Sequence, residues 1–167
     1  YADGQTGYEI LAERTVEQLK YIHAVYDLAK EKGYIQDATF TGMKHRMEQE
    51  NMQRSEKVAR GEAVYGLKEY TLDLYQEYEL SMIEEAYILD ETNEGMGLTE
   101  EEIEAYYNTR DWIVGEDARK ADLSEARAAV IDEMRRNRYQ ELTEQKAAVA
   151  EVDGDMDQLS QFTLKQL

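Results

Sequence analysis

The stretch that decides the fold is the last long helical run, Leu123–Val152 (LSEARAAVIDEMRRNRYQELTEQKAAVAEV). Asp122 or Ser124 can cap its start, and Glu125 lies where the helix dipole favours an anion. Its bulky apolar residues fall mostly on one broad face at helical spacing: Leu123, Val130, Ile131, Met134, Leu142, Val149 and Val152. A helix of this length, roughly 45 Å, needs partners from earlier in the chain to bury that face. We therefore expect the end of the chain to pack back on its beginning.

The composition favours a helical protein with an acidic surface. Its 167 residues suffice for one domain with a core of its own. Proline is absent, although average usage of about 5% would give roughly eight, so long helices can run uninterrupted. Nineteen basic residues against 37 acidic ones leave a net charge of −18, which opposes binding to nucleic acid and to anionic membranes. We expect no nucleic-acid partner.

Cysteine content and the first residue bear on chemistry and location. The absence of cysteine excludes disulfides, thiolate metal sites and cysteine nucleophiles, but it does not fix the compartment. No apolar run approaches the length of a membrane span. Because the sequence begins at Tyr1 instead of an initiator methionine, we expect a processed or truncated product whose signal segment or lipid anchor lies outside this fragment.

The rest of the pattern predicts three further long helices and one short one. They cover about 7–32, from Asp37 or Thr39 to about Arg60, about Leu67 to Leu89, and a short helix opened by a capping box of Thr99 and Glu102. Gly33 is the expected end of the first helix, and Gly61 and Gly66 interrupt the next junction. No alternating pattern demands a sheet. The sequence therefore predicts an all-α, long-helix bundle in a single domain, 1–167, with a loose lead-in at 1–6, a connector at 110–122 and a tail at 153–167.

Residue sets that could support catalysis or metal binding do not meet their requirements. A helical di-metal site needs Glu-x-x-His pairs, yet Lys20 and Gly42 stand three residues before His23 and His45. The acidic residues of 153–157 resemble a calcium loop, but Gln158 and Leu164 occupy the positions of its glycine and its bidentate glutamate. A solvated acidic turn is the expected structure there. We predict no catalytic residues, no metal site, no cofactor and no enzyme activity.

Two features stand above this background. Asn51 and Arg54 interrupt the apolar stripe of the second helix, where they could form a structural latch with Tyr or Glu of the third helix or contact a ligand; the latch is favoured. A series of Tyr and Met residues recurs at helical spacing: Met43, Met47, Met52, Tyr70, Tyr75, Tyr78 and Met82. Such a series is core more often than surface. If part of it is exposed, it forms an adaptable surface for extended polypeptide.

Three segments give a resemblance to a known family. Gln18–Tyr34 (QLKYIHAVYDLAKEKGY), Leu98–Val114 (LTEEEIEAYYNTRDWIV) and the closing run Leu123–Asp153 resemble, in their order and spacing, the helical domain of SurA/PrsA-type extracytoplasmic chaperones. The resemblance implies a fold in which the final helix returns to the first. In that family a parvulin prolyl isomerase domain usually precedes the closing helix. Because the connector 110–122 is too short for such a domain, isomerase activity is not expected.

Two functional hypotheses follow from these observations. The first is a non-catalytic, chaperone-like module of an exported bacterial protein, secreted or anchored as a lipoprotein, that holds unfolded or extended polypeptide clients in a groove lined by the Tyr/Met series. The second is a helical structural or protein-interaction module of an exported or cell-surface protein, with a homodimer as one form that it could take. Under both hypotheses contact with a membrane depends on an anchor outside this fragment.

Overall fold

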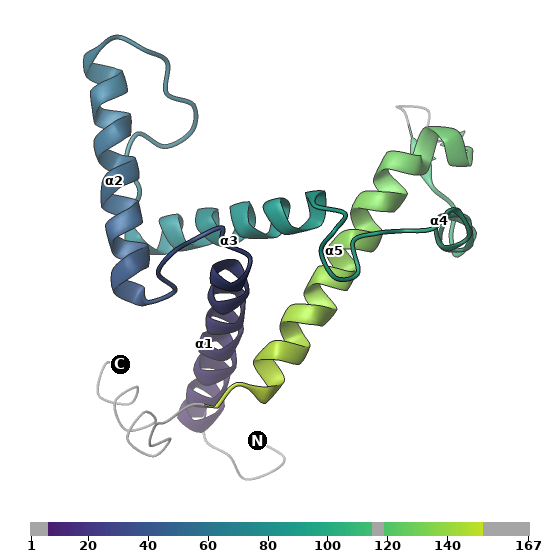
Figure 1. Ribbon diagram of the computed structural model, residues 1–167, viewed down its shortest axis with the longest axis horizontal. Helices are drawn as coiled ribbons and strands as arrows, with labels where there is room; N and C mark the ends of the chain where they lie inside the picture. The colour runs from purple at the N-terminus through teal and green to yellow at the C-terminus, as the bar shows by residue number, and fades with distance from the viewer. Residues whose placement is uncertain (1–6, 115–118, 152–167) are drawn as a thin grey trace. The chain divides into compact units, whose positions relative to one another are not determined.

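The computed structural model describes residues 7–114 and 119–151 (Figure 1). Its helices are α1 (Gly7–Glu31), α2 (Phe40–Ala59), α3 (Leu72–Leu89), α4 (Glu100–Tyr107) and α5 (Leu123–Val149). Within the described ranges the only strands are β1 (Ile113–Val114) and β2 (Arg119–Lys120), a two-residue antiparallel pair. The prediction of an all-α fold is confirmed.

The chain divides into two compact units. Unit 1 comprises Tyr1–Leu80 and Thr143–Leu167, and unit 2 comprises Ser81–Leu142. The boundaries fall inside α3 and α5, so each of these two helices contributes residues to both units.

In unit 1 the last turns of α5 pack against α1. Thr143 is fully buried, and the ammonium of Lys146 lies 3.6 Å from the carboxylate of Glu31. On α1 the buried positions recur at helical spacing, so that one face is apolar: Ala24, Val25, Leu28 and Ala29. The predicted return of the final helix to the first is therefore confirmed. Val149, at the end of the expected apolar face of α5, is instead 80% exposed.

Local capping explains where the predicted helices begin and end. Thr39 caps α2, because its hydroxyl accepts a hydrogen bond from Gly42 N–H at 3.1 Å. Thr99 and Glu102 form the predicted capping box at α4. At α5 the carboxylate of Asp122, and not Ser124, accepts the Glu125 N–H at 3.0 Å. These three starts agree with the sequence analysis.

The predicted start of the third helix near Leu67 is wrong, because α3 begins at Leu72. Two side chains of α2 bind the backbone of the segment before it, as described below. Gly66, predicted to interrupt this junction, has φ of +78°. Residues 60–71 are therefore an irregular segment that returns along α2 (Figure 1).

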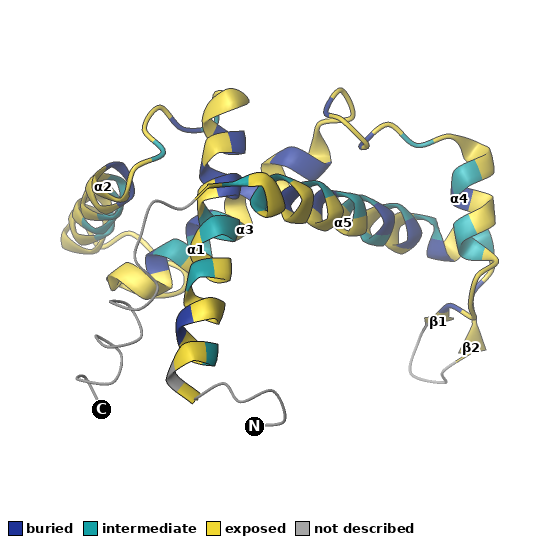
Figure 2. Cartoon of the chain, turned by 90° about the horizontal axis from the view of Figure 1, so that it is seen from below, coloured by how far each residue is buried: buried dark blue, intermediate teal, exposed yellow. Residues whose placement is uncertain are grey.

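Unit 2 has an apolar core of its own, formed by α4, the β1–β2 hairpin and the first turns of α5. Its buried members are Ile103, Trp112, Ala121, Ala126, Val130 and Met134. The hairpin occupies the predicted connector 110–122 and is fixed by the bond from Ala121 N–H to Trp112 O at 2.7 Å. Along α5 the buried residues recur about every four positions with exposed residues between them, and on α4 Ile103 is the buried residue (Figure 2). The predicted lead-in 1–6 and tail 153–167 lie outside the described residues.

Candidate functional site

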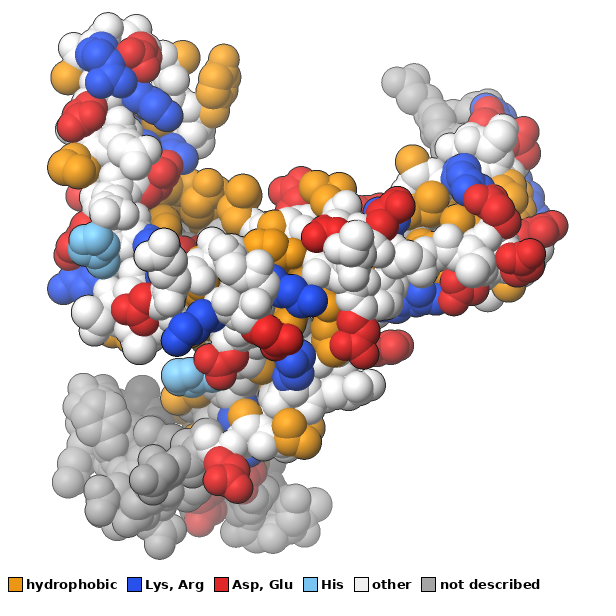
Figure 3. All heavy atoms as spheres, in the orientation of Figure 1, with side chains coloured by type: hydrophobic (Ala, Val, Ile, Leu, Met, Phe, Trp, Pro, Cys, Tyr) orange, Lys and Arg blue, Asp and Glu red, His pale blue; other side chains and the backbone are white. Residues whose placement is uncertain are grey.

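Three tyrosine rings gather in unit 1, where the segment before α3 meets the first turns of that helix. The Tyr70 and Tyr78 rings are stacked at a centroid distance of 5.1 Å, and Tyr75 contacts both, at 5.7 and 6.0 Å. Tyr75 is buried, whereas Tyr70 and Tyr78 are half-buried. Hydrophobic side chains are visible at the surface near the junction of α2 and α3 (Figure 3). The cluster is thus partly core and partly surface.

Asn51 and Arg54 connect α2 to the segment that carries Tyr70. The Asn51 amide donates to Tyr70 O at 2.9 Å and accepts from Tyr70 N–H at 2.7 Å. The Arg54 guanidinium donates to Tyr65 O at 3.0 Å and to Leu67 O at 2.7 Å, and it lies 4.8 Å from the centre of the Tyr70 ring. Five backbone and ring interactions from two side chains therefore fix an otherwise irregular segment.

The polar groups of Arg54 are directed by its own helix. Its Nε donates to the carboxylate of Glu50 at 2.7 Å, one turn earlier on α2, and its side chain is only 12% exposed. Glu50 therefore orients the guanidinium so that its remaining N–H groups point at the carbonyls of the segment.

An ion pair with a buried carboxylate joins α2 and α3 next to Tyr75. The Arg46 guanidinium donates two hydrogen bonds to the carboxylate of Glu79, at 2.6 and 2.9 Å, and Tyr75 OH donates to it at 3.2 Å. The Glu79 side chain is 9% exposed. Burial raises the pKa of Tyr75 and of Tyr26, and the nearby Glu79 carboxylate raises both further. Both phenols therefore stay neutral at a pH where an exposed tyrosine would ionise.

A hollow of about 600 Å³ opens beside this ion pair, at the start of α2, and is lined by residues that include Asp37, His45 and Arg46. Its charged groups are already engaged. Arg46 binds Glu79 and also donates to Asp37 O at 2.6 Å, and the Asp37 carboxylate accepts from Thr39 N–H at 2.9 Å. The hollow is therefore a weaker candidate for a binding site than the exposed apolar side chains of residues 60–74.

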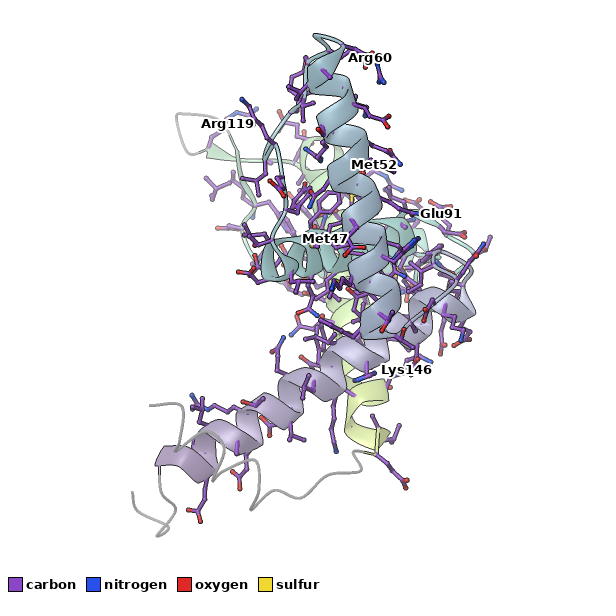
Figure 4. The ribbon with its side chains drawn as sticks, turned by 90° about the vertical axis from the view of Figure 1, so that its left-hand side faces the viewer. Met47, Met52, Arg60, Glu91, Arg119 and Lys146 are labelled. Atoms are coloured by element: carbon purple, nitrogen blue, oxygen red, sulfur yellow. The ribbon has the colours of Figure 1, made fainter. Side chains whose placement is uncertain are left out.

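The predicted Tyr/Met series does not lie on one surface. Met43 and Tyr75 are buried, whereas Met52 and Met82 are 59% and 47% exposed. Met47 is half-buried, as are Tyr70 and Tyr78. Met47 and Met52 project from the middle of α2, and Arg60 marks its end (Figure 4). The structure brings the three tyrosines together, and polypeptide binding by the series remains a prediction.

The sequence analysis did not identify Arg46, Glu79 or the exposed aromatic Tyr65. Arg46 and Glu79 are 33 residues apart, and each lies among other charged residues, so no local pattern distinguishes a buried pair. Tyr65 did carry a signal, since an aromatic residue directly before a glycine in a turn-rich segment is available for exposure.

Among the residues that the structure describes, no group of three or more metal-ligating side chains is placed to hold an ion. In the same ranges no helix combines the length and the apolar character needed to cross a bilayer.

Solved structures with a similar fold belong to a glycoside hydrolase. The native protein and the selenomethionine derivative of the GH136 lacto-N-biosidase from Eubacterium ramulus match with TM-scores of 0.64 and 0.66, at 18% sequence identity. Each match covers 87% of this chain and 29% of the enzyme chain. At this identity the likeness shows the fold alone: part of that longer chain has the same helical arrangement.

A closer relative is found by sequence. The chain is 36% identical over 166 residues to the "Chaperone for lacto-N-biosidase" of Bifidobacterium longum subsp. longum. The alignment covers 99% of this chain and 59% of that relative, so the chain spans less than two thirds of the relative's length. No protein-family model matches the chain.

These comparisons contradict the predicted relationship to SurA/PrsA-type chaperones. Both the sequence relative and the solved structures are connected with lacto-N-biosidase, and neither points to that family. The three segments that suggested the resemblance are amphipathic helices, whose spacing is common to many helical proteins. The missing parvulin domain therefore gives no support for an absence of isomerase activity.

Proposed function

We propose that this chain is a non-catalytic chaperone for a glycoside hydrolase of the lacto-N-biosidase class. The observation that carries the proposal is the identity of 36% over 166 residues with a chaperone for lacto-N-biosidase. Since the alignment takes in 99% of this chain, the similarity includes both compact units. The client is accordingly a particular enzyme, and not unfolded polypeptide in general.

The fold comparison supports the same client class. In the Eubacterium ramulus enzyme a similar helical arrangement takes up a minor part of the lacto-N-biosidase chain itself. One enzyme would carry the helical unit in its own chain, and another would receive it from a separate protein. In both cases the unit would serve the same folding step. Partner and enzyme would then meet through a defined interface.

Coexpression tests the proposal. The lacto-N-biosidase of Bifidobacterium longum is expressed alone, with this chain, with the Bifidobacterium longum chaperone as the positive control, or with an unrelated acidic helical protein. We expect soluble, active enzyme to increase with this chain and not with the unrelated protein. The purified chain assayed by itself should release no lacto-N-biose, because the role is non-catalytic.

Two results would contradict the proposal. One is an enzyme yield with this chain equal to that with the unrelated protein, in an experiment where the Bifidobacterium longum chaperone raises it. The other is hydrolysis by the chain alone. Homodimerisation and an extracytoplasmic location are further predictions, which light scattering and fractionation of the source cells would address.

A further inference from the structure

The irregular segment 60–71 of unit 1 presents an aromatic side chain to solvent. Tyr65 is 88% exposed, more than any other large hydrophobic residue among those described. Four apolar neighbours in sequence are also exposed, by 39 to 46%: Val58, Leu67, Leu72 and Leu74. We call these five residues the Tyr65 surface. Folding gains little from them, because their apolar area remains in water.

The backbone beneath the Tyr65 surface is held firmly. Arg54 binds the carbonyl oxygens of Tyr65 and Leu67, on either side of Gly66, and Asn51 binds both backbone groups of Tyr70. Gly66 has φ of +78°, which lets the chain turn so that both carbonyls face the same guanidinium. The segment is therefore ordered by polar contacts to its backbone, while its apolar side chains stay outside.

This combination suits binding to another protein. Association requires that flexible side chains and loops at the interface be ordered, which costs free energy, and a segment already fixed avoids much of that cost. An exposed tyrosine on a rigid backbone supplies large contact area with few rotatable bonds, and tyrosine is among the residues that dominate interface energies.

The local charge indicates the chemistry of the partner. Between residues 58 and 74 two basic side chains, Arg60 and Lys68, stand against three acidic ones, Glu62, Glu69 and Asp73, a formal charge of −1, although the whole chain carries −18. The Tyr65 surface thus lies in a nearly neutral stretch of an acidic protein. A neutral, apolar patch on a folded protein fits it better than a basic peptide or an anionic membrane.

We propose that the Tyr65 surface is where this chain docks on its enzyme client, with the Tyr65 ring as the central anchor. The inference rests on the proposed function, which supplies the occupant: a neutral apolar patch of the lacto-N-biosidase polypeptide. Leu67 lies two residues from the anchor and its carbonyl is bound by the same Arg54 guanidinium. Arg54 and Asn51 act as positioning residues that keep the segment in its binding conformation.

A refolding titration tests this inference. Urea-denatured lacto-N-biosidase from Bifidobacterium longum is diluted into increasing concentrations of the chain, and recovered activity gives the concentration for half-maximal rescue. For Tyr65→Ala we expect that concentration to rise by at least about tenfold, because a central aromatic anchor is lost. Tyr65→Phe keeps the ring and should stay within about twofold of the unmodified chain.

Matched controls separate docking from folding. Leu89→Ala removes another large apolar side chain, 67% exposed but outside the surface, and should leave rescue unchanged. Arg54→Lys retains the charge but loses the fork that spans two carbonyls, so it should raise the half-maximal concentration while Tyr65 is intact. Circular dichroism and melting of each variant verify that the helices persist.

The outcomes distinguish the inference from the proposed function. Rescue by the unmodified chain together with equal rescue by Tyr65→Ala and Leu89→Ala would overturn the inference and leave the proposed function standing. A loss of rescue with Tyr65→Phe as large as with Tyr65→Ala would show that the Tyr65 ring is not an apolar anchor. Failure of the unmodified chain itself, while the Bifidobacterium longum chaperone rescues, would reject the proposed function.

Discussion

The core of unit 2 is apolar with its charges outside, whereas the junction of α2 and α3 in unit 1 places a charged pair inside. In unit 2, Trp112 and Val130 are buried among aliphatic and aromatic neighbours, and ion pairs such as Arg127 with Glu100 lie at the surface. In unit 1, Arg46 and Glu79 form a two-bond pair with little exposure. Burial of apolar area has no preferred direction, whereas hydrogen-bonded charges fix one geometry. The junction of α2 and α3, with its hydrogen-bonded ion pair, therefore has the fixed geometry that an interface needs.

Removal of the central aromatic of unit 2 should have the largest effect. Trp112→Ala empties a buried site and loses the hydrogen bond from the indole N–H to Tyr107 O at 3.1 Å, so we expect a loss of about 4 kcal/mol in the free energy of unfolding. Urea titration measures it. The neighbouring Ile113→Ala, at a side chain 57% exposed, should change stability by less than about 0.5 kcal/mol. Equal effects would show that the core does not depend on Trp112.

Removal of the buried carboxylate of unit 1 should be nearly as damaging. Glu79→Ala leaves the Arg46 guanidinium without its partner, and we expect a loss of about 3 kcal/mol. Glu100→Ala deletes one partner of the exposed pair with Arg127 and should scarcely move the melting temperature. If both variants melt alike, the distinction between a structural pair and a surface pair is lost.

The capping box of α4 should contribute less than either core. Thr99→Ala removes the acceptor of the Glu102 N–H, and we expect a loss of about 1 kcal/mol. Hydrogen exchange should show reduced protection at the first turn of α4, with protection of α1 unchanged. Thr109→Ala, which also removes an exposed hydroxyl but no helix cap, is the comparison variant.

Acid should lower the stability of unit 2 slightly, through protonation of the Glu102 carboxylate. The Glu102 carboxylate accepts hydrogen bonds from the Thr99 N–H and from the Arg138 guanidinium. The first of these bonds has the larger effect, and both hold the pKa of Glu102 below the ordinary 4.5. A carboxyl with a lowered pKa in the folded state contributes stability above its unfolded pKa, and that contribution is lost as the pH falls through the folded value. Glu102→Gln keeps the cap but cannot titrate, so its melting temperature should fall less below pH 4.5. Parallel curves for the two proteins would exclude this contribution.

The elements that could be predicted from sequence are those set by contacts close in the chain. Thr39 and Thr99 sit before helices as caps, and the required bonds join residues three apart. The start of α3 could not be predicted, because Asn51 and Arg54 bind the segment before it from 11 to 19 residues away. The division of the Tyr/Met series between core and surface could not be predicted for a related reason: helical spacing shows which residues share a face, but not what covers that face.

The sequence by itself determined an all-α chain and its main helix caps, because hydrophobic period and capping are local properties. It also indicated the return of the last helix to the first, because a long amphipathic helix needs a partner for its apolar face. Only the tertiary structure decided that Arg46 and Glu79 are buried together and that Tyr65 is left outside. Those outcomes depend on which distant side chains meet, and burial of a charge is favourable only when its partner arrives with the right geometry.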